Sequence, residues 1–185
     1  MPAALTRRDL LLSLAATVAA PARAQAPTGS IRCLVEVLFF RQPGPAPPAM
    51  RAGPLPQVTT IPGRVELLPE SDWQLGAAEA ALGRNGEYRP LAHALWAAVV
   101  PPNGRTTARL EDELPTGVPL AGALAVQRSQ YLYLAVDVDF TSPEGPVYPM
   151  RERRRVKFAE TQYFDHPAFG LIARVTATRG IAATD

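Results

Sequence analysis

The sequence predicts a single α+β domain of two layers, in which an antiparallel sheet of about five strands carries two helices on one face. Three observations predict it: a long apolar segment opens the domain, two segments of helical periodicity follow together, and strand-like segments joined by short turns complete the chain. Strands joined by short turns pair antiparallel, and helices grouped beside such a sheet form a two-layer α+β domain.

Residues 1–24 have the pattern of a signal peptide and are predicted to lie outside this domain. Arg7 and Arg8 precede a leucine-rich run, and Ala22-Arg23-Ala24 forms a cleavage site of the A-x-A type. The paired arginines fit the twin-arginine export route, with a Sec signal that happens to contain two arginines as the alternative. We expect cleavage after Ala24, a periplasmic mature protein and a linker at residues 25–30.

Charge and cysteine content restrict the function classes. The chain has 19 Lys+Arg and 17 Asp+Glu, and removal of residues 1–24 leaves 16 of each, so the net charge gives no indication of nucleic-acid binding and no nucleic-acid partner is predicted. No apolar run reaches the ~18 residues that a membrane span needs. Cys33 is the only cysteine, which excludes a disulfide within the chain, and its apolar surroundings predict a buried thiol.

The domain is expected over residues 31–179, followed by a tail at 180–185. Residues 31–40 are almost continuously apolar, which predicts a central strand. Residues 43–69 contain eight prolines and predict an exposed, extended Pro-rich loop. A helix is predicted from Ser71, through a capping box with Gln74, to about Leu82, and a second from Pro90 to about Ala98.

The second half of the domain reads as strands. Segments 106–110 and 120–126 are candidates, and residues 131–140 alternate clearly: Leu132, Leu134, Val136, Val138 and Phe140 face a core, whereas Tyr131, Tyr133, Asp137 and Asp139 face the other way. A strand from Arg151 through Tyr163 is expected next. It ends in a turn at Asp165-His166-Pro167, and the apolar residues after Gly170 return beside it.

The strand from Arg151 carries the main functional candidate. Arg151, Arg153, Arg155 and Lys157 would share one face, while Val156 and Phe158 would enter the core from the other. One interpretation is structural, because Asp137 and Asp139 on the preceding strand can form cross-strand ion pairs with these arginines. The other is a carboxylate-binding surface flanked by Tyr131 and Tyr133, since two acids cannot neutralise four cations and arginine grips carboxylates bidentately.

The sequence gives little support to catalysis or to metal and cofactor binding. The only histidines are His93 and His166, too few for a zinc module beside one cysteine, and no nucleotide-binding or hydrolase motif occurs. Asp165 and His166 are adjacent and would point in opposite directions in an extended chain. No catalytic residue, metal ligand or cofactor is predicted, and a small hydrolase using Glu160, Asp165 and His166 is the weakest alternative.

Several motifs resemble the CsiV-type peptidoglycan-binding family of Gram-negative bacteria. The closing signature is the most specific and consists of Arg153-Arg154-Arg155, Glu160, Tyr163-Phe164, Asp165-His166-Pro167 and Phe169-Gly170. The weaker matches are Val35 to Arg41, the Tyr-x-x-Leu-x-His-x-x-Trp helix at Tyr88 to Trp96, and Gly122 with Tyr131-Leu132-Tyr133-Leu134, where Tyr133 stands in place of the family's usual His.

The resemblance implies a non-catalytic periplasmic protein that binds peptidoglycan and supports a bifunctional cell-wall synthase, directly or through the synthase's activator. The family's binding residues do not transfer to individual positions of this chain. A periplasmic assembly protein whose signature is purely structural is therefore the second interpretation.

Overall fold

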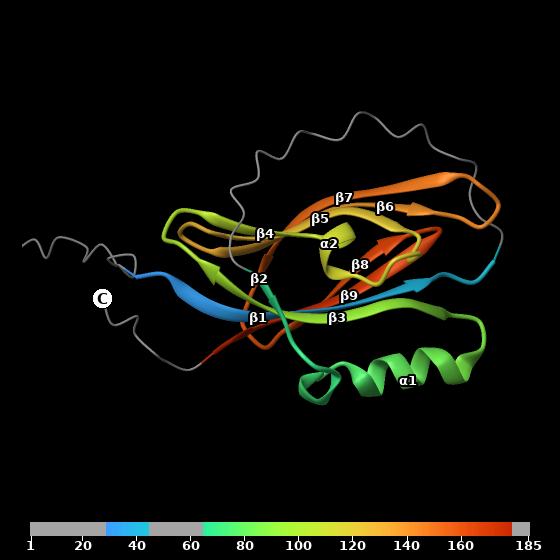
Figure 1. The fold of residues 1–185 in the computed structure, drawn as a ribbon, viewed down its shortest axis with the longest axis horizontal. Coiled ribbons are helices and arrows are strands. Elements are labelled where there is room, and N and C mark those ends of the chain that lie inside the picture. The colour runs from blue at the N-terminus through green and yellow to red at the C-terminus, as the bar shows by residue number, and fades with distance from the viewer. Residues whose placement is uncertain (1–28, 45–64, 179–185) are drawn as a thin grey trace, which may run out of the picture.

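The computed structural model describes residues 29–44 and 65–178, which form two antiparallel β-sheets packed face to face. Figure 1 shows the two layers, with α1 on the outer side of the lower one. The first sheet has the strand order β2-β3-β1-β9-β8 and the second has the order β4-β5-β6-β7. The strands are β1 (Ile31–Arg41), β2 (Val65–Leu67), β3 (Arg89–Val100), β4 (Arg105–Arg109), β5 (Leu120–Arg128), β6 (Leu132–Thr141), β7 (Val147–Val156), β8 (Thr161–His166) and β9 (Phe169–Ala177).

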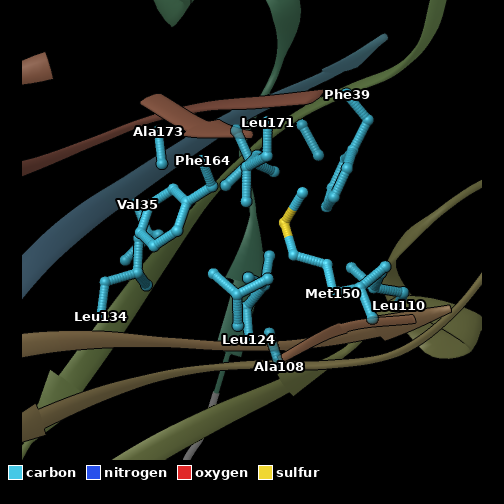
Figure 2. Packing of buried hydrophobic residues seen from close by; sticks show 14 of the residues in the cluster. Val35, Phe39, Ala108, Leu110, Leu124, Leu134, Met150, Phe164, Leu171 and Ala173 are labelled. Atoms are coloured by element: carbon cyan, nitrogen blue, oxygen red, sulfur yellow. The ribbon is translucent and has the colours of Figure 1, made fainter. Parts of the chain in front are cut away.

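The core lies between the two sheets and is built by alternate residues of nearly every strand. Figure 2 shows Val35, Phe39, Phe164, Leu171 and Ala173 of the first sheet above Leu124, Leu134 and Met150 of the second. The predicted antiparallel, two-layer arrangement with a sheet of five strands is therefore present. The second layer, however, is another sheet, and helices contribute only α1 (Gly76–Asn85), the four-residue α2 (Leu110–Glu113) and the 3-10 turn η1 (Glu70–Asp72) among the described residues.

The strands with the clearest sequence patterns are confirmed. The apolar segment at 31–40 is β1, which lies between β3 and β9 and is buried along most of its length. The alternating segment at 131–140 is β6, whose Leu134, Val136, Val138 and Phe140 enter the core. The candidate strands at 106–110 and 120–126 correspond to β4 and β5.

The predicted second helix is wrong, because residues 89–100 form strand β3. This segment pairs with β1 along its length and with β2 near its end. The five consecutive residues 94–98 are all buried, so both faces of the strand are covered there and the spacing of apolar residues cannot distinguish a helix from a strand. Pro90 is accommodated where the register with β1 shifts between Phe39 and Phe40, since a bulge tolerates the missing N–H. Trp96 is buried on this strand.

The first predicted helix exists, but it starts later than expected. Ser71 belongs to η1, and α1 begins at Gly76 with no side-chain capping bond from its own N-cap residue. The carboxylate of Glu36 on β1 accepts the N–H groups of Gln74 and Leu75 instead, each at 2.7 Å. At the other end, α1 continues past Leu82 to Asn85, and Gly86 follows with φ 68°, the left-handed conformation that favours glycine.

The predicted strand from Arg151 through Tyr163 is interrupted and divided between the two sheets. β7 ends at Val156, Ala159 turns with φ 62°, and β8 begins at Thr161 on the edge of the other sheet. Val156 is buried as predicted. Phe158 lies in the turn and is 43% exposed, so its predicted place in the core is wrong.

Part of the predicted Pro-rich loop is structured, since Val65–Leu67 forms the short edge strand β2. An edge position is compatible with nearby prolines, as only one side of the strand is paired. Residues 45–64 of this loop, the predicted signal peptide at 1–24 and the tail at 180–185 lie outside the described residues. Within the described ranges, no helix is both long and apolar enough to cross a membrane.

Candidate functional site

The candidate site is the outer face of the second sheet at β6 and β7, which we call the arginine face: Tyr131, Tyr133, Arg151, Arg153 and Arg155. These residues project away from the core because the intervening Tyr148, Met150 and Val156 of β7 and Leu134 and Val136 of β6 are buried between the sheets. The antiparallel register places Tyr133 opposite Arg155 and Asp137 opposite Arg151. The structure thus assembles the arginines and tyrosines that the sequence analysis selected.

Arg151 has a structural role on this face. Its Nε lies 2.5 Å from Asp137 Oδ1 and its second terminal nitrogen lies 2.6 Å from Asp139 Oδ1. Its remaining terminal nitrogen donates to the backbone carbonyls of Val138 and Met150. The Asp137 contact lacks the alignment of a hydrogen bond, and burial raises the pKa of Asp137 although Arg151 acts in the opposite direction. The predicted cross-strand ion pairs are therefore real, but Arg151 alone makes both of them.

Arg153 and Arg155 have different surroundings, because each guanidinium lies over a tyrosine ring. Arg153 Cζ is 3.8 Å from the centroid of Tyr133, and Arg155 Cζ is 3.5 Å from the centroid of Tyr131. Both arginines are exposed, as predicted, and within the part of the chain that the structure describes neither has an acidic partner. Cation–π contacts of this kind contribute about 0.5–1 kcal/mol at exposed sites, enough to restrict the side chain without neutralising it.

The fourth predicted member of this row does not belong to the strand. Lys157 follows the last residue of β7, and its ammonium group lies 3.8 Å from Glu160 in the turn. Arg154, between the two stacked arginines, points the other way. It binds Glu152 at 2.6 Å and donates to the backbone carbonyl of Tyr163 on β8 at 2.6 Å, which ties the edges of the two sheets together.

The structure adds neighbours that the sequence analysis did not select. Gln127 of β5 lies opposite Tyr133 and accepts a hydrogen bond from Arg153 Nε at 3.2 Å. Arg105 of β4 lies opposite Gln127 and is exposed, so it adds a further positive charge to the same row. The alternation of residues along β5 could have predicted that Gln127 lies on an outer face. The strand order of the folded sheet is needed to show that β5 lies beside β6, which carries Tyr133, and that β4 lies beyond β5.

A model of the family described as "Peptidoglycan-binding protein, CsiV" matches residues 51–178, which is more than half of the chain. The chain belongs to the CsiV family of peptidoglycan-binding proteins. The match includes the whole arginine face and the strands β2 to β9. A peptidoglycan-binding family points to the cell envelope as the protein's location. No curated protein and no solved structure matches the chain.

The closing signature of this CsiV-family protein is divided between the two sheets: its three arginines lie on β7, and its residues from Tyr163 to Gly170 form the β8–β9 hairpin of the first sheet. Asp165 points outward and accepts hydrogen bonds from Tyr163 at 2.7 Å and from Gln42 at 2.6 Å. Burial and the hydrogen bond to Asp165 raise the pKa of Tyr163 to about 12. Pro167 occupies the exposed turn that follows.

His166 points the other way, into the core beside Tyr148 and Phe169. Its Nδ1 accepts the backbone N–H of Ala168 at 3.2 Å, and burial lowers its pKa. Asp165 and His166 therefore lie on opposite faces, as the sequence analysis expected, and form no catalytic dyad. In the described parts of the CsiV-family chain, no group of three or more potential metal ligands occurs.

Proposed function

We propose that this protein is an exported, non-catalytic accessory protein that binds peptidoglycan through the arginine face and supports cell-wall synthesis. The observation that carries the proposal is the pair of exposed arginines, Arg153 and Arg155, stacked on tyrosines and lacking acidic partners among the described residues. Peptidoglycan stem peptides offer carboxylates, and arginine binds carboxylates through paired N–H groups.

Export and the protein partner belong to the same proposal. The signal peptide at residues 1–24 would be cleaved after Ala24 to release the mature protein into the periplasm, where peptidoglycan is found. There it would support a bifunctional cell-wall synthase, or the activator of such a synthase, as the family resemblance implies. Intact-mass analysis of the periplasmic fraction tests the first step, since an uncleaved chain in the cytosol would contradict it.

The experiment for peptidoglycan binding is co-sedimentation of the mature protein with purified sacculi. The double variant Arg153→Ala/Arg155→Ala should lose sedimentation and keep its thermal midpoint within a few degrees, because exposed charges contribute only about 0–1 kcal/mol each to stability. Arg84→Ala removes an exposed arginine from α1 and serves as the matched control that should still sediment. Binding should also weaken with salt, since the Debye length is ~8 Å at 0.15 M.

The structural alternative makes the opposite prediction. If Arg153 and Arg155 only stabilise the sheet, the double variant should sediment like the wild type and unfold at a clearly lower temperature. That result would leave the protein without this binding surface.

A further inference from the structure

We propose that Arg153 and Arg155 act as a matched pair that grips two carboxylates of one stem peptide, so that the protein reads the peptide and not the glycan of peptidoglycan. This inference rests on the proposed function and specifies the chemistry of its ligand. It follows from which cations on the arginine face are free, how they are held, and how far apart they lie.

Only two side chains of the predicted cationic row are free to bind a ligand. Arg151 donates to Asp139 and to two backbone carbonyls and also contacts Asp137, so all of its nitrogens are engaged. Arg153 uses only its Nε–H, toward Gln127, and Arg155 makes no hydrogen bond to another described residue. A guanidinium has five N–H donors, so both terminal amino groups of Arg153 and the whole fork of Arg155 are available.

The tyrosines fix the direction in which these donors point. With Cζ only 3.8 Å and 3.5 Å from the ring centroids, a guanidinium standing upright would drive a nitrogen into the ring. We infer that each guanidinium lies roughly parallel to its tyrosine ring, so that its N–H groups point outward past the edge of the ring. A carboxylate binds in the plane of the guanidinium, so a ligand carboxylate beside the tyrosine ring can meet these donors, and the stacked side chains have little rotamer entropy left to lose.

The spacing of the pair selects a ligand with two charges. Arg153 and Arg155 are two residues apart on one strand, a separation of about 6.7 Å at the rise of an antiparallel strand. Tyr131 and Tyr133 repeat at the same interval, so the face presents two equivalent arginine–tyrosine units side by side. Two adjacent cations repel each other, and a single ligand with two carboxylates relieves this repulsion at both positions.

Peptidoglycan offers such a ligand in its peptide and not in its sugar backbone. A stem peptide carries several carboxylates along a short chain, whereas the glycan presents mainly hydroxyl groups and neutral amides. A protein that reads paired carboxylates therefore depends on their ionised state and not on glycan length. Converting the carboxylates to amides removes the charge with almost no change in size.

The test is co-sedimentation with purified sacculi before and after amidation of their carboxylates with carbodiimide and ammonia. We expect amidation to weaken binding at least tenfold. Soluble muropeptides should compete with unmodified sacculi, whereas chitin oligosaccharides, which have no carboxylates, should not. The single variants Arg153→Ala and Arg155→Ala should each weaken binding roughly tenfold, while Arg84→Ala should not change it.

The outcomes separate the two proposals. If amidated and native sacculi bind equally well while Arg153→Ala/Arg155→Ala still abolishes binding, the arginine face recognises another part of peptidoglycan and the carboxylate inference is wrong. If one of the two arginines carries the entire effect, the matched pair is wrong. If the wild type does not sediment with native sacculi at all, the proposed function itself fails.

Discussion

Replacement of His93 should undock α1 from the first sheet, because this side chain holds a buried carboxylate in place. Glu36 is 2% exposed, and its Oε1 accepts hydrogen bonds from the backbone of Gln74 and Leu75 at the start of α1. The same oxygen lies 3.0 Å from His93 Nε2, while His93 Nδ1 lies 2.8 Å from Glu79 Oε2 on α1. One histidine thus links β3, β1 and the helix.

The magnitude follows from burial. His93→Ala removes a hydrogen bond to a buried charged group, which costs about 1.5–3 kcal/mol, and the ring that packs 3.8 Å from Trp73. The two remaining N–H donors to Glu36 soften the loss. We expect a destabilisation of about 3 kcal/mol. Glu79→Ala is the matched control: its side chain is 35% exposed, so its pair should contribute no more than about 1 kcal/mol.

The assay combines denaturant unfolding of the mature protein with hydrogen exchange resolved along the chain. His93→Ala should lower the free energy of unfolding and accelerate exchange in α1 more than in the β1 core, since the helix loses its anchor first. A double-mutant cycle with Glu36→Gln should give a coupling energy of about 1–2 kcal/mol. A His93→Ala variant within about 1 kcal/mol of wild type, with unchanged exchange in α1, would refute this account of the helix anchor.

Three further predictions test the remaining assignments. Burial lowers the pKa of His166, so the unfolded chain binds more protons than the folded one below pH ~6.5, and the free energy of unfolding should decrease as the pH falls through this range. His166→Asn, whose amide oxygen can accept the Ala168 N–H, should flatten this slope in unfolding free energies measured from about pH 7.5 to 5. Equal slopes for the variant and the wild type would contradict this prediction. Phe158→Ala should cost no more than about 1 kcal/mol in a denaturation curve, because the side chain is 43% exposed; a larger loss would mean that the turn is packed differently. Burial raises the pKa of Cys33 to about 12, so a thiol reagent at pH 8 should react only after unfolding, and rapid labelling of the folded protein would show that β1 is accessible.

Segments whose pattern matches one structure could be predicted from the sequence. Residues 131–140 alternate between apolar and polar side chains, and β6 has the predicted residues in the core. The continuous apolar run at 31–40 likewise identifies the central strand β1. In both cases local preference and tertiary environment agree, which is the condition under which reading a pattern succeeds.

β3 and the break after Val156 could not be predicted, for two different reasons. Residues 89–100 are rich in alanine and leucine, which favour a helix locally, but a strand covered on both faces gains more from pairing and burial. After Val156 the basic alternation continues through Lys157 with no glycine or proline, so nothing in the pattern marks the point where the chain changes sheets. Ala159 adopts the positive φ that a glycine would have signalled.

That change of sheet explains how one arginine-rich strand can combine structural and binding roles. Arg151 ties β7 to β6 through Asp137 and Asp139, and Arg154, on the opposite face, ties β7 to β8 through the Tyr163 carbonyl. β7 is an edge strand, and edge strands are otherwise free to fray or to pair with other chains. Because both of its faces are anchored, the strand can hold Arg153 and Arg155 in a fixed orientation, and neither arginine is needed for a structural ion pair. The same arginine-rich sequence therefore supplies both the anchors and the unpaired cations, and β8 supports the arginine face from the neighbouring sheet through the Tyr163 carbonyl.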